Sequence, residues 1–221
     1  MIMMGCQKNI DSPIINTSTQ VSSSFDENLY LFANPDVTEL IKQGKYKSGL
    51  EHYTKVGQTT KKSDGNAYES FFFGSNGNDT VTSFGSGKHT HLSGVKFQVI
   101  PNSKDPLPLK TLSIAKGESD ILIGTKDGIN EFILGNFITS SNPKSQAFYL
   151  GKGDADFARI KNFTKSKDSI MLAGEPKQYQ FKTLDNNLHI SIAGDLIAVI
   201  EGVNKLTPSD ISKEMGIFML K

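Results

Sequence analysis

The sequence predicts a mainly β fold in which solenoid-like coils, as in a β-roll, are capped by an antiparallel meander behind a small N-terminal helical module. Three observations lead to this prediction. An apolar run, a turn rich in glycine and acidic or amide residues, and a second alternating run recur near Phe71, Ile121 and Phe148. From Tyr68 onward the apolar residues recur with period two, which is typical of strands. Residues 24–57 instead carry the end signals of short helices.

The helical signals come from two capping patterns. Ser24 and Glu27 fit a capping box, in which a serine side chain caps free N–H groups and a glutamate bonds back. Ser48 and Glu51 fit a second capping box. Helices this short are marginal alone, so we expect them to dock on a larger core.

Three segments follow from these patterns. Residues 1–23 are polar and rich in Ser, Thr and Asn, which is typical of a flexible leader. Residues 24–63 form the helical module and its linker, and residues 64–221 form the β domain. Its candidate strands lie at residues 69–73, 79–84, 95–100, 119–123, 131–134, 147–150, 156–163, 168–172, 178–183, 188–192 and 196–200.

The last three candidate strands are predicted to form the antiparallel meander. Residues 185–187 and 193–195 supply turns that tolerate positive φ. Residues 196–200 are continuously apolar, which predicts burial on both faces. Thr207 and Pro208 then signal the start of a short helix, and residues 101–108 predict an irregular loop because proline blocks strand pairing.

Composition and motifs argue against several classes of protein. The net charge is +1, from 24 Lys and Arg against 23 Asp and Glu, so no basic footprint for nucleic acid is indicated. Cys6 is the single cysteine, which excludes an internal disulfide. No apolar run approaches the roughly 20 residues of a transmembrane helix. Because no G-x-S-x-G, H-E-x-x-H or G-x-G-x-x-G motif occurs, we predict a protein that is not an enzyme.

The turns carry the residues with the clearest chemistry. Oxygen atoms from carboxylates, amides and backbone carbonyls are the ligands that calcium prefers, and glycine lets the backbone curl around an ion. We therefore take these positions as candidate calcium ligands: Gly74, Asn76, Gly77 and Asp79 in the first turn, Asp127 and Asn130 in the second, and Gly151, Gly153, Asp154 and Asp156 in the third.

Residues 74–82 resemble the glycine-rich nonapeptide G-G-x-G-x-D-x-U-x of the RTX (hemolysin-type) calcium-binding proteins. The match covers Gly74, Gly77, Asp79 and the apolar Val81, whereas serine replaces the second glycine. The second turn needs one extra residue and has asparagine in place of aspartate. Residues 160–172 resemble the segment that often closes RTX blocks, and the meander after them is similar to the tails of secreted cyanobacterial RTX-like proteins.

The resemblance implies calcium ions held between successive coils in an exported, non-enzymatic protein. It also implies a secreted or cell-surface location reached by type I export, with the address in the C-terminal region. Three alternatives stay open. The turns lie much further apart than the roughly nine residues of the repeat, so they could be vestigial corners. The chain could also be a surface adhesion or matrix protein that binds a partner or glycan, or the accessory tail of a secreted hydrolase.

Two further patterns were weighed. Residues 85–88 lack the first glycine of a P-loop and are followed by His89 rather than Ser or Thr, so a phosphate loop is rejected. His89 and His91 would share one face of an extended strand, which could seed a zinc site. Because no third ligand lies nearby in the sequence, we interpret them as ordinary exposed positions.

Overall fold

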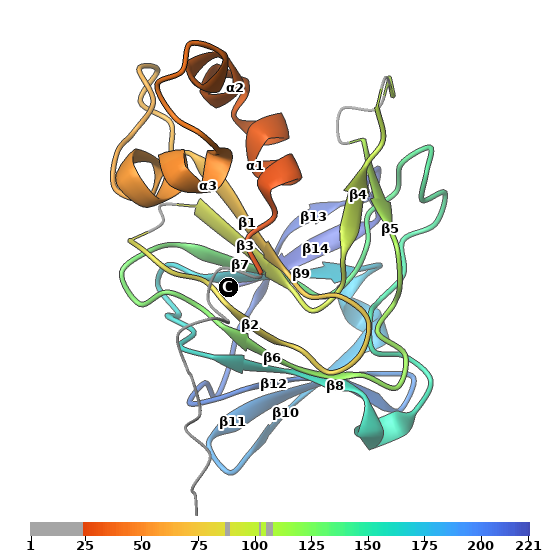
Figure 1. Ribbon diagram of the computed structural model, residues 1–221. Helices are drawn as coiled ribbons and strands as arrows, with labels where there is room; N and C mark the ends of the chain where they lie inside the picture. The colour runs from red at the N-terminus through yellow and green to blue at the C-terminus, as the bar shows by residue number, and fades with distance from the viewer. Residues whose placement is uncertain (1–23, 87–88, 102, 105–107) are drawn as a thin grey trace, which may run out of the picture.

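The computed structural model describes residues 24–86, 89–101, 103–104 and 108–221. The predicted leader, with Cys6, and part of the predicted loop over residues 101–108 lie outside the described residues. The rest of the chain forms a two-sheet β-roll joined to a small group of helices (Figure 1).

The roll is built by a chain that alternates between two sheets. The first sheet contains the parallel strands β1 (Glu69–Phe73), β3 (His89–Ser93), β7 (Asn130–Ile133) and β9 (Ser169–Ala173). The second contains the parallel strands β2 (Thr80–Thr82), β6 (Ser119–Ile123), β8 (Phe157–Lys161) and β12 (Asp195–Ile200). Each strand of one sheet leads to a strand of the other, so the predicted solenoid is confirmed.

The last coil is closed by antiparallel strands in both sheets. In the second sheet β11 (Asn187–Ile192) pairs with β12, and β10 (Tyr179–Leu184) pairs with β11, which confirms the predicted meander. In the first sheet β14 (Ile217–Leu220) pairs with β9, and β13 (Pro208–Ser212) pairs with β14. The predicted helix start at Thr207 is wrong, because the backbone of Thr207 exchanges two hydrogen bonds with Lys221 (2.7 and 3.0 Å) and enters this ladder.

Two other strand predictions need correction. Residues 147–150 form no regular strand: Phe148 and Tyr149 are fully buried, and Tyr149 has a φ of 59°, which breaks the extended conformation. Residues 95–100 are the one strand predicted between residues 85 and 117, but this segment holds more. It contains β3, which completes the first sheet, and a separate hairpin of β4 (Phe97–Val99) and β5 (Leu109–Thr111).

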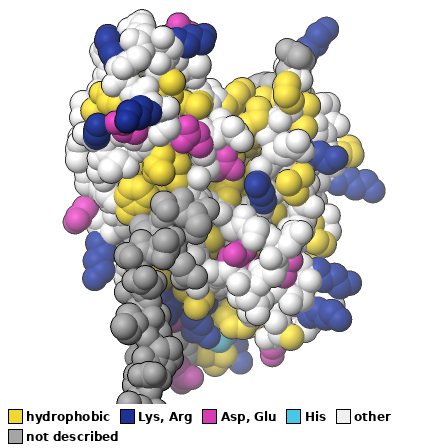
Figure 2. Space-filling model, viewed as in Figure 1, with side chains coloured by type: hydrophobic (Ala, Val, Ile, Leu, Met, Phe, Trp, Pro, Cys, Tyr) yellow, Lys and Arg dark blue, Asp and Glu magenta, His cyan; other side chains and the backbone are white. Residues whose placement is uncertain are grey.

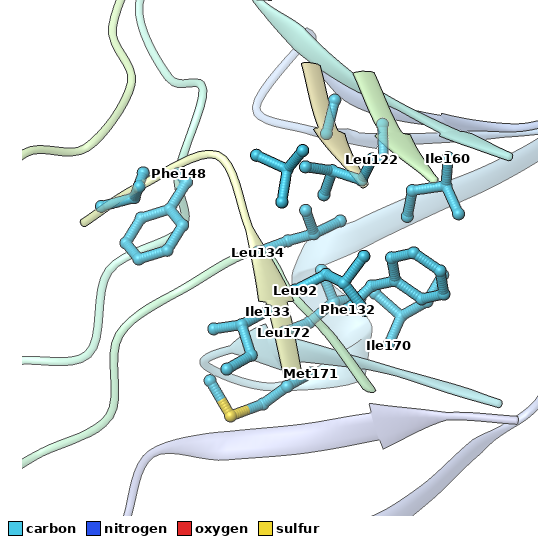
Figure 3. Close-up of a cluster of buried hydrophobic side chains, with 14 of the residues drawn as sticks. Leu92, Leu122, Phe132, Ile133, Leu134, Phe148, Ile160, Ile170, Met171 and Leu172 are labelled. Carbon is cyan, nitrogen blue, oxygen red and sulfur yellow. The ribbon is translucent and has the colours of Figure 1, made fainter. Parts of the chain in front are cut away.

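The core lies between the two sheets. Period-two alternation turns Leu92 and Phe132 of the first sheet toward Leu122 and Ile160 of the second, and all four side chains are fully buried (Figure 3). Because parallel coils stack in register, these residues form continuous apolar rows along the roll. Burying each such side chain contributes about 1.5–3 kcal/mol to folding.

The helices cover the free edge of β1. They are α1 (Glu27–Ala33), α2 (Pro35–Lys42), α3 (Gly49–His52) and a π-helical turn, η1 (Tyr53–Gly57). The Phe25 ring packs on the Phe72 ring with centroids 5.6 Å apart, and the Tyr53 hydroxyl donates to the carbonyl of Phe84. The backbone just before α1 also pairs with β1, since the Asp26 N–H donates to the Phe71 carbonyl and the Phe73 N–H donates to the Ser24 carbonyl, both at 2.8 Å. Strand β1 is therefore not left as an exposed edge.

The two predicted capping boxes have different outcomes. Ser48 caps α3 by accepting a hydrogen bond from the Glu51 N–H at 3.0 Å, as expected, but the Glu51 carboxylate accepts from the Lys47 N–H at 2.6 Å rather than from Ser48, so only the serine half of this box forms. The box at Ser24 is wrong, since the Ser24 carbonyl accepts a hydrogen bond from the Phe73 N–H of β1. Asp26 caps α1 instead, and accepts from the Leu29 N–H at 3.0 Å.

Replacing Leu122 by alanine should lower the free energy of unfolding by about 2–5 kcal/mol, because it opens a cavity between the sheets. The exposed Leu112, which is 49% accessible, provides a matched control, and Leu112→Ala should change stability by less than about 0.5 kcal/mol. Urea denaturation followed by circular dichroism measures both. Equal effects of the two substitutions would contradict this description of the core.

Candidate metal centre

The three predicted turns do not form one stack. The chain passes from the first to the second sheet along what we call the entry edge, and it passes back along the opposite, return edge. The first and third turns, with Asp79 and Asp156, lie on the entry edge. The second turn, with Asp127 and Asn130, joins β6 to β7 and lies on the return edge. The second turn therefore cannot share an ion with the other two.

In the first turn the polar side chains form hydrogen bonds within the turn. Asp79 Oδ2 accepts a hydrogen bond from the Ser75 N–H at 2.7 Å, and Asn76 and Gly77 are exposed at the tip. A Cβ atom on Gly74 would lie 2.3 Å from the carbonyl oxygen of Gly94, so glycine is required there.

On the entry edge, aspartates stand at the first residue or two of the second-sheet strands or just before them. Their carboxylates accept hydrogen bonds from backbone N–H groups in the turn of the preceding coil. Such charge-assisted hydrogen bonds are about twice as strong as neutral ones and connect neighbouring coils. The pairs are Asp79 N–H to Asp120 (2.8 Å), Gly117 N–H to Asp156 (2.9 Å), and Gly151 and Gly153 N–H to Asp195 (2.6 and 2.9 Å).

On the return edge Asn130 is fully buried and its amide group is saturated. Its Oδ1 accepts from the Thr125 N–H at 3.0 Å, and its Nδ2 donates to the Thr125 carbonyl and to Asp168 Oδ1 at 3.0 Å. Burial raises the pKa of Asp168. Asp127 is exposed in the same turn, as Asp154 is on the other edge.

One pair of carboxylates on the entry edge keeps oxygen atoms free. Glu118 and Asp156 immediately precede the registered pair Ser119 and Phe157, so they lie side by side at the starts of neighbouring strands. Asp156 is fully buried. Within the described residues, Asp156 Oδ1 and Glu118 Oε2 are buried oxygen atoms that lack a hydrogen-bond partner.

The same edge concentrates negative charge. Burial raises the pKa of Asp120, and the neighbouring carboxylates of Asp79 and Glu118 raise it further, against the hydrogen bonds from the Asp79 N–H and the Tyr149 hydroxyl. The Tyr149 bond is 2.7 Å long and buried. A cation at this edge would relieve the repulsion between the carboxylates.

A second cluster lies on the outer face of the first sheet. Ser70, Thr90 and Phe132 are fully buried, so the alternating side chains beside them point outward. The outward residues are Glu69 on β1, His89 and His91 on β3, and Glu131 on β7. The register pairs Glu69 with His89, and His91 with Glu131.

Glu69 is the centre of this cluster. Its Oε2 atom contacts Nδ1 of His89 and lies 2.9 Å from Nε2 of His91. On its other side His91 places Nδ1 3.4 Å from Glu131 Oε1, and the Phe71 ring stacks on the imidazole at 4.8 Å. Within the part of the chain that the structure describes, these are the His and carboxylate groups that converge in the manner of metal ligands, with Glu69, His89 and His91 offering atoms within 4.8 Å of one another.

The cluster shifts the proton affinities of its members in opposite directions. Burial alone would raise the pKa of Glu69, but the hydrogen bonds and charges of His89 and His91 outweigh it and lower that pKa to about 2. Burial would lower the pKa of His91, but the bonds to Glu131 and Glu69 raise it to about 9. The carboxylates of Glu69 and Glu131 therefore favour the protonated, positively charged form of His91.

The interpretation of His89 and His91 as ordinary exposed positions missed Glu69. The third ligand comes from the preceding coil, and sequence distance hides it. The available signal was that Glu69, His89, His91 and Glu131 all occupy outward positions in neighbouring first-sheet strands, but β3 itself was not predicted.

Comparison with models of protein families and with curated proteins finds no match to this chain. Among the described residues, no helix is both long and apolar enough to cross a membrane. On the face shown in Figure 2, Lys and Arg side chains are spread around the rim with acidic side chains among them, rather than gathered in one patch.

In the presence of a chelator, the free energy of unfolding should fall as the pH rises from about 6.5 to about 9. The pKa of His91 is raised from 6.5 to about 9 in the folded state, so its stabilising effect is complete below the lower value and is lost as the pH passes the higher one. Urea denaturation across this range measures the effect. His91→Asn should remove most of this dependence of unfolding free energy on pH, whereas His189→Asn should leave it unchanged. If the wild type and His91→Asn show the same pH dependence, His91 is not the group responsible for it.

Proposed function

We propose that this protein is an exported, non-enzymatic β-roll of RTX type that binds calcium on its entry edge. The observation that carries the proposal is the pair of buried oxygen atoms, Glu118 Oε2 and Asp156 Oδ1, which belong to neighbouring coils and lack a hydrogen-bond partner among the described residues. Buried carboxylate oxygens without a partner are costly unless a cation or a proton satisfies them.

Calcium suits this position for two reasons. It prefers hard oxygen ligands, and the RTX resemblance implies ions between successive coils. The carboxylates of Asp79 and Glu118 also raise the pKa of Asp120, so a cation bound beside these three carboxylates would be favoured electrostatically. Extracellular calcium modules work with dissociation constants of about 10⁻⁴–10⁻³ M, which would fit a site with few protein ligands.

The other predicted ligands fit a structural role in this proposal. The carboxylate of Asp79 and the amide of Asn130 already bind backbone N–H groups, and Asp127 and Asp154 are exposed. We therefore propose that calcium binds beside Glu118 and Asp156, while the remaining Gly and Asp residues make corners.

Calcium at millimolar concentration should raise the melting temperature of the wild-type protein. Binding to the folded state alone adds about 1.4 kcal/mol at ten times the dissociation constant. Glu118→Gln and Asp156→Asn should each remove most of this effect, whereas the exposed Asp154→Asn is the matched control and should keep it.

Differential scanning calorimetry in calcium and in chelator measures the shift. Identical melting of the wild type in both buffers would reject the calcium proposal. A Glu118→Gln variant that is stabilised relative to the wild type equally in calcium and in chelator would also contradict the calcium proposal.

Export by a type I route is the second part of the proposal. Strand β14 lies between β9 and β13 in the first sheet, and its Phe218 and Leu220 side chains are fully buried. An export signal in the C-terminal region would therefore have to be recognised before the roll folds. The low calcium concentration inside the cell would favour this, because the roll would fold only after export.

In a host with a type I exporter, the full chain should reach the medium and a chain ending at Val203 should stay inside. Because the shortened chain lacks β13 and β14, residues 204–221 should also be fused to an unrelated passenger, which should then be exported. Immunoblots of cells and medium measure both. Retention of the full chain and of the fusion would reject type I export.

A surface adhesion role is the second candidate, and one observation favours it. Strand β10 is the outer strand of the second sheet, and Phe181 and Leu184 on it are 37% and 40% exposed. Such an edge can accept a strand from a partner. Partner binding that persists in chelator and is lost in Phe181→Lys would favour this role over calcium binding.

A further inference from the structure

We propose that Glu69, His89 and His91 form a binding site for a divalent transition metal of the zinc class, with Glu131 as a positioning residue. The site lies on the outer face of the first sheet, away from the entry edge, and the proposal does not depend on calcium binding. It rests on convergence, donor chemistry and the support given to each ligand.

Convergence is the first argument. Glu69 Oε2, His89 Nδ1 and His91 Nε2 belong to two neighbouring strands and lie within 4.8 Å of one another. Zinc bonds to imidazole nitrogen and carboxylate oxygen at about 2.0–2.2 Å, so small rotations of the side chains would bring the three atoms around one ion. The Glu69 and His89 side chains are 33% and 37% exposed, which leaves a path for an ion from solvent.

Donor chemistry is the second argument. Two imidazoles and one carboxylate favour zinc, cobalt, nickel or copper over calcium and magnesium, which prefer oxygen alone. Three protein ligands leave the fourth tetrahedral position for water or another small ligand. The cluster therefore fits an open metal site rather than a closed structural one.

Support from surrounding residues is the third argument. Glu131 faces Nδ1 of His91 at 3.4 Å, which leaves Nε2 of His91 for the metal. The stacked Phe71 ring, inclined by 11°, fixes the imidazole plane. The buried Asn34 holds the Glu69 backbone with two hydrogen bonds of 2.8 and 3.2 Å.

The metal would add to the connection between two coils, which are already joined by the β1–β3 ladder and by the hydrogen bond from Ser70 Oγ to Thr90 Oγ1 at 3.1 Å. Glu69 lies on β1 and both histidines lie on β3, so an ion would stabilise the roll where it begins. Binding to the folded state should therefore raise the melting temperature in proportion to the logarithm of metal concentration.

The test uses the full chain without a polyhistidine tag, stripped of metal, with Cys6→Ser in every variant to remove the thiol. Isothermal titration with zinc should show one equivalent bound, and the visible absorption of cobalt(II) should report tetrahedral or five-fold coordination. Glu69→Gln and His89→Asn should each weaken zinc binding at least about tenfold. His189→Asn, which removes a histidine outside the cluster, should bind as the wild type does.

Glu131→Gln separates positioning from ligation. It should weaken zinc about 10- to 100-fold while the cobalt spectrum keeps its coordination pattern. Excess calcium should leave zinc bound, whereas it would compete if both ions used the entry edge. Circular dichroism shows that each variant is folded before titration.

Two results would overturn the site. One is the absence of saturable zinc binding to the wild-type chain at neutral pH, which would make the cluster a set of Glu–His ion pairs alone. The other is binding by Glu69→Gln and His89→Asn that equals the wild type. An unchanged affinity in Glu131→Gln would reject the positioning role of that residue.

Discussion

In-register stacking of parallel coils is the constraint on which the rest of this structure depends. It places inward residues of successive strands in continuous apolar rows, and it brings each turn against the turn of the next coil. Polar groups at the corners must then be satisfied by the neighbouring coil, because water cannot reach all of them. Asp120, Asp156 and Asn130 meet this need through backbone N–H groups and side chains one coil away.

Local sequence signals were sufficient for much of the fold but for little of the site. Period-two alternation and Gly/Asp turns predicted the roll and its antiparallel end, because both are properties of short segments. The strand β3 escaped prediction, and pairing with Lys221 overrode the helix signal at Thr207. Glu69 and His89 lie in different coils, so their contact exists only through the register, which no local pattern specifies.

The two proposed cation sites differ in chemistry because they lie on different surfaces of the roll. At the entry edge the backbone turns, and the unpartnered side-chain atoms of Glu118 and Asp156 there are oxygens. On the sheet face, side chains stand two residues apart and project outward, which lets the imidazoles of His89 and His91 meet a carboxylate from β1. The same stacking thus produces oxygen ligands, which suit calcium, at the turns and a set of nitrogen and oxygen ligands, which suits zinc, on the sheet face.

Both ends of the first sheet are closed, and this limits how insertions and deletions can alter the length of the roll. Helices cover β1 at one end, and the antiparallel pair β14 and β13 completes the other. A whole coil gained or lost between β3 and β7 would leave both closures and the inward rows intact. An insertion of one residue within a strand would turn the later side chains of that strand to the opposite face. Extra residues in a turn would not, as the hairpin of β4 and β5 between β3 and β6 shows. The stacked part of the roll can therefore lengthen by whole coils.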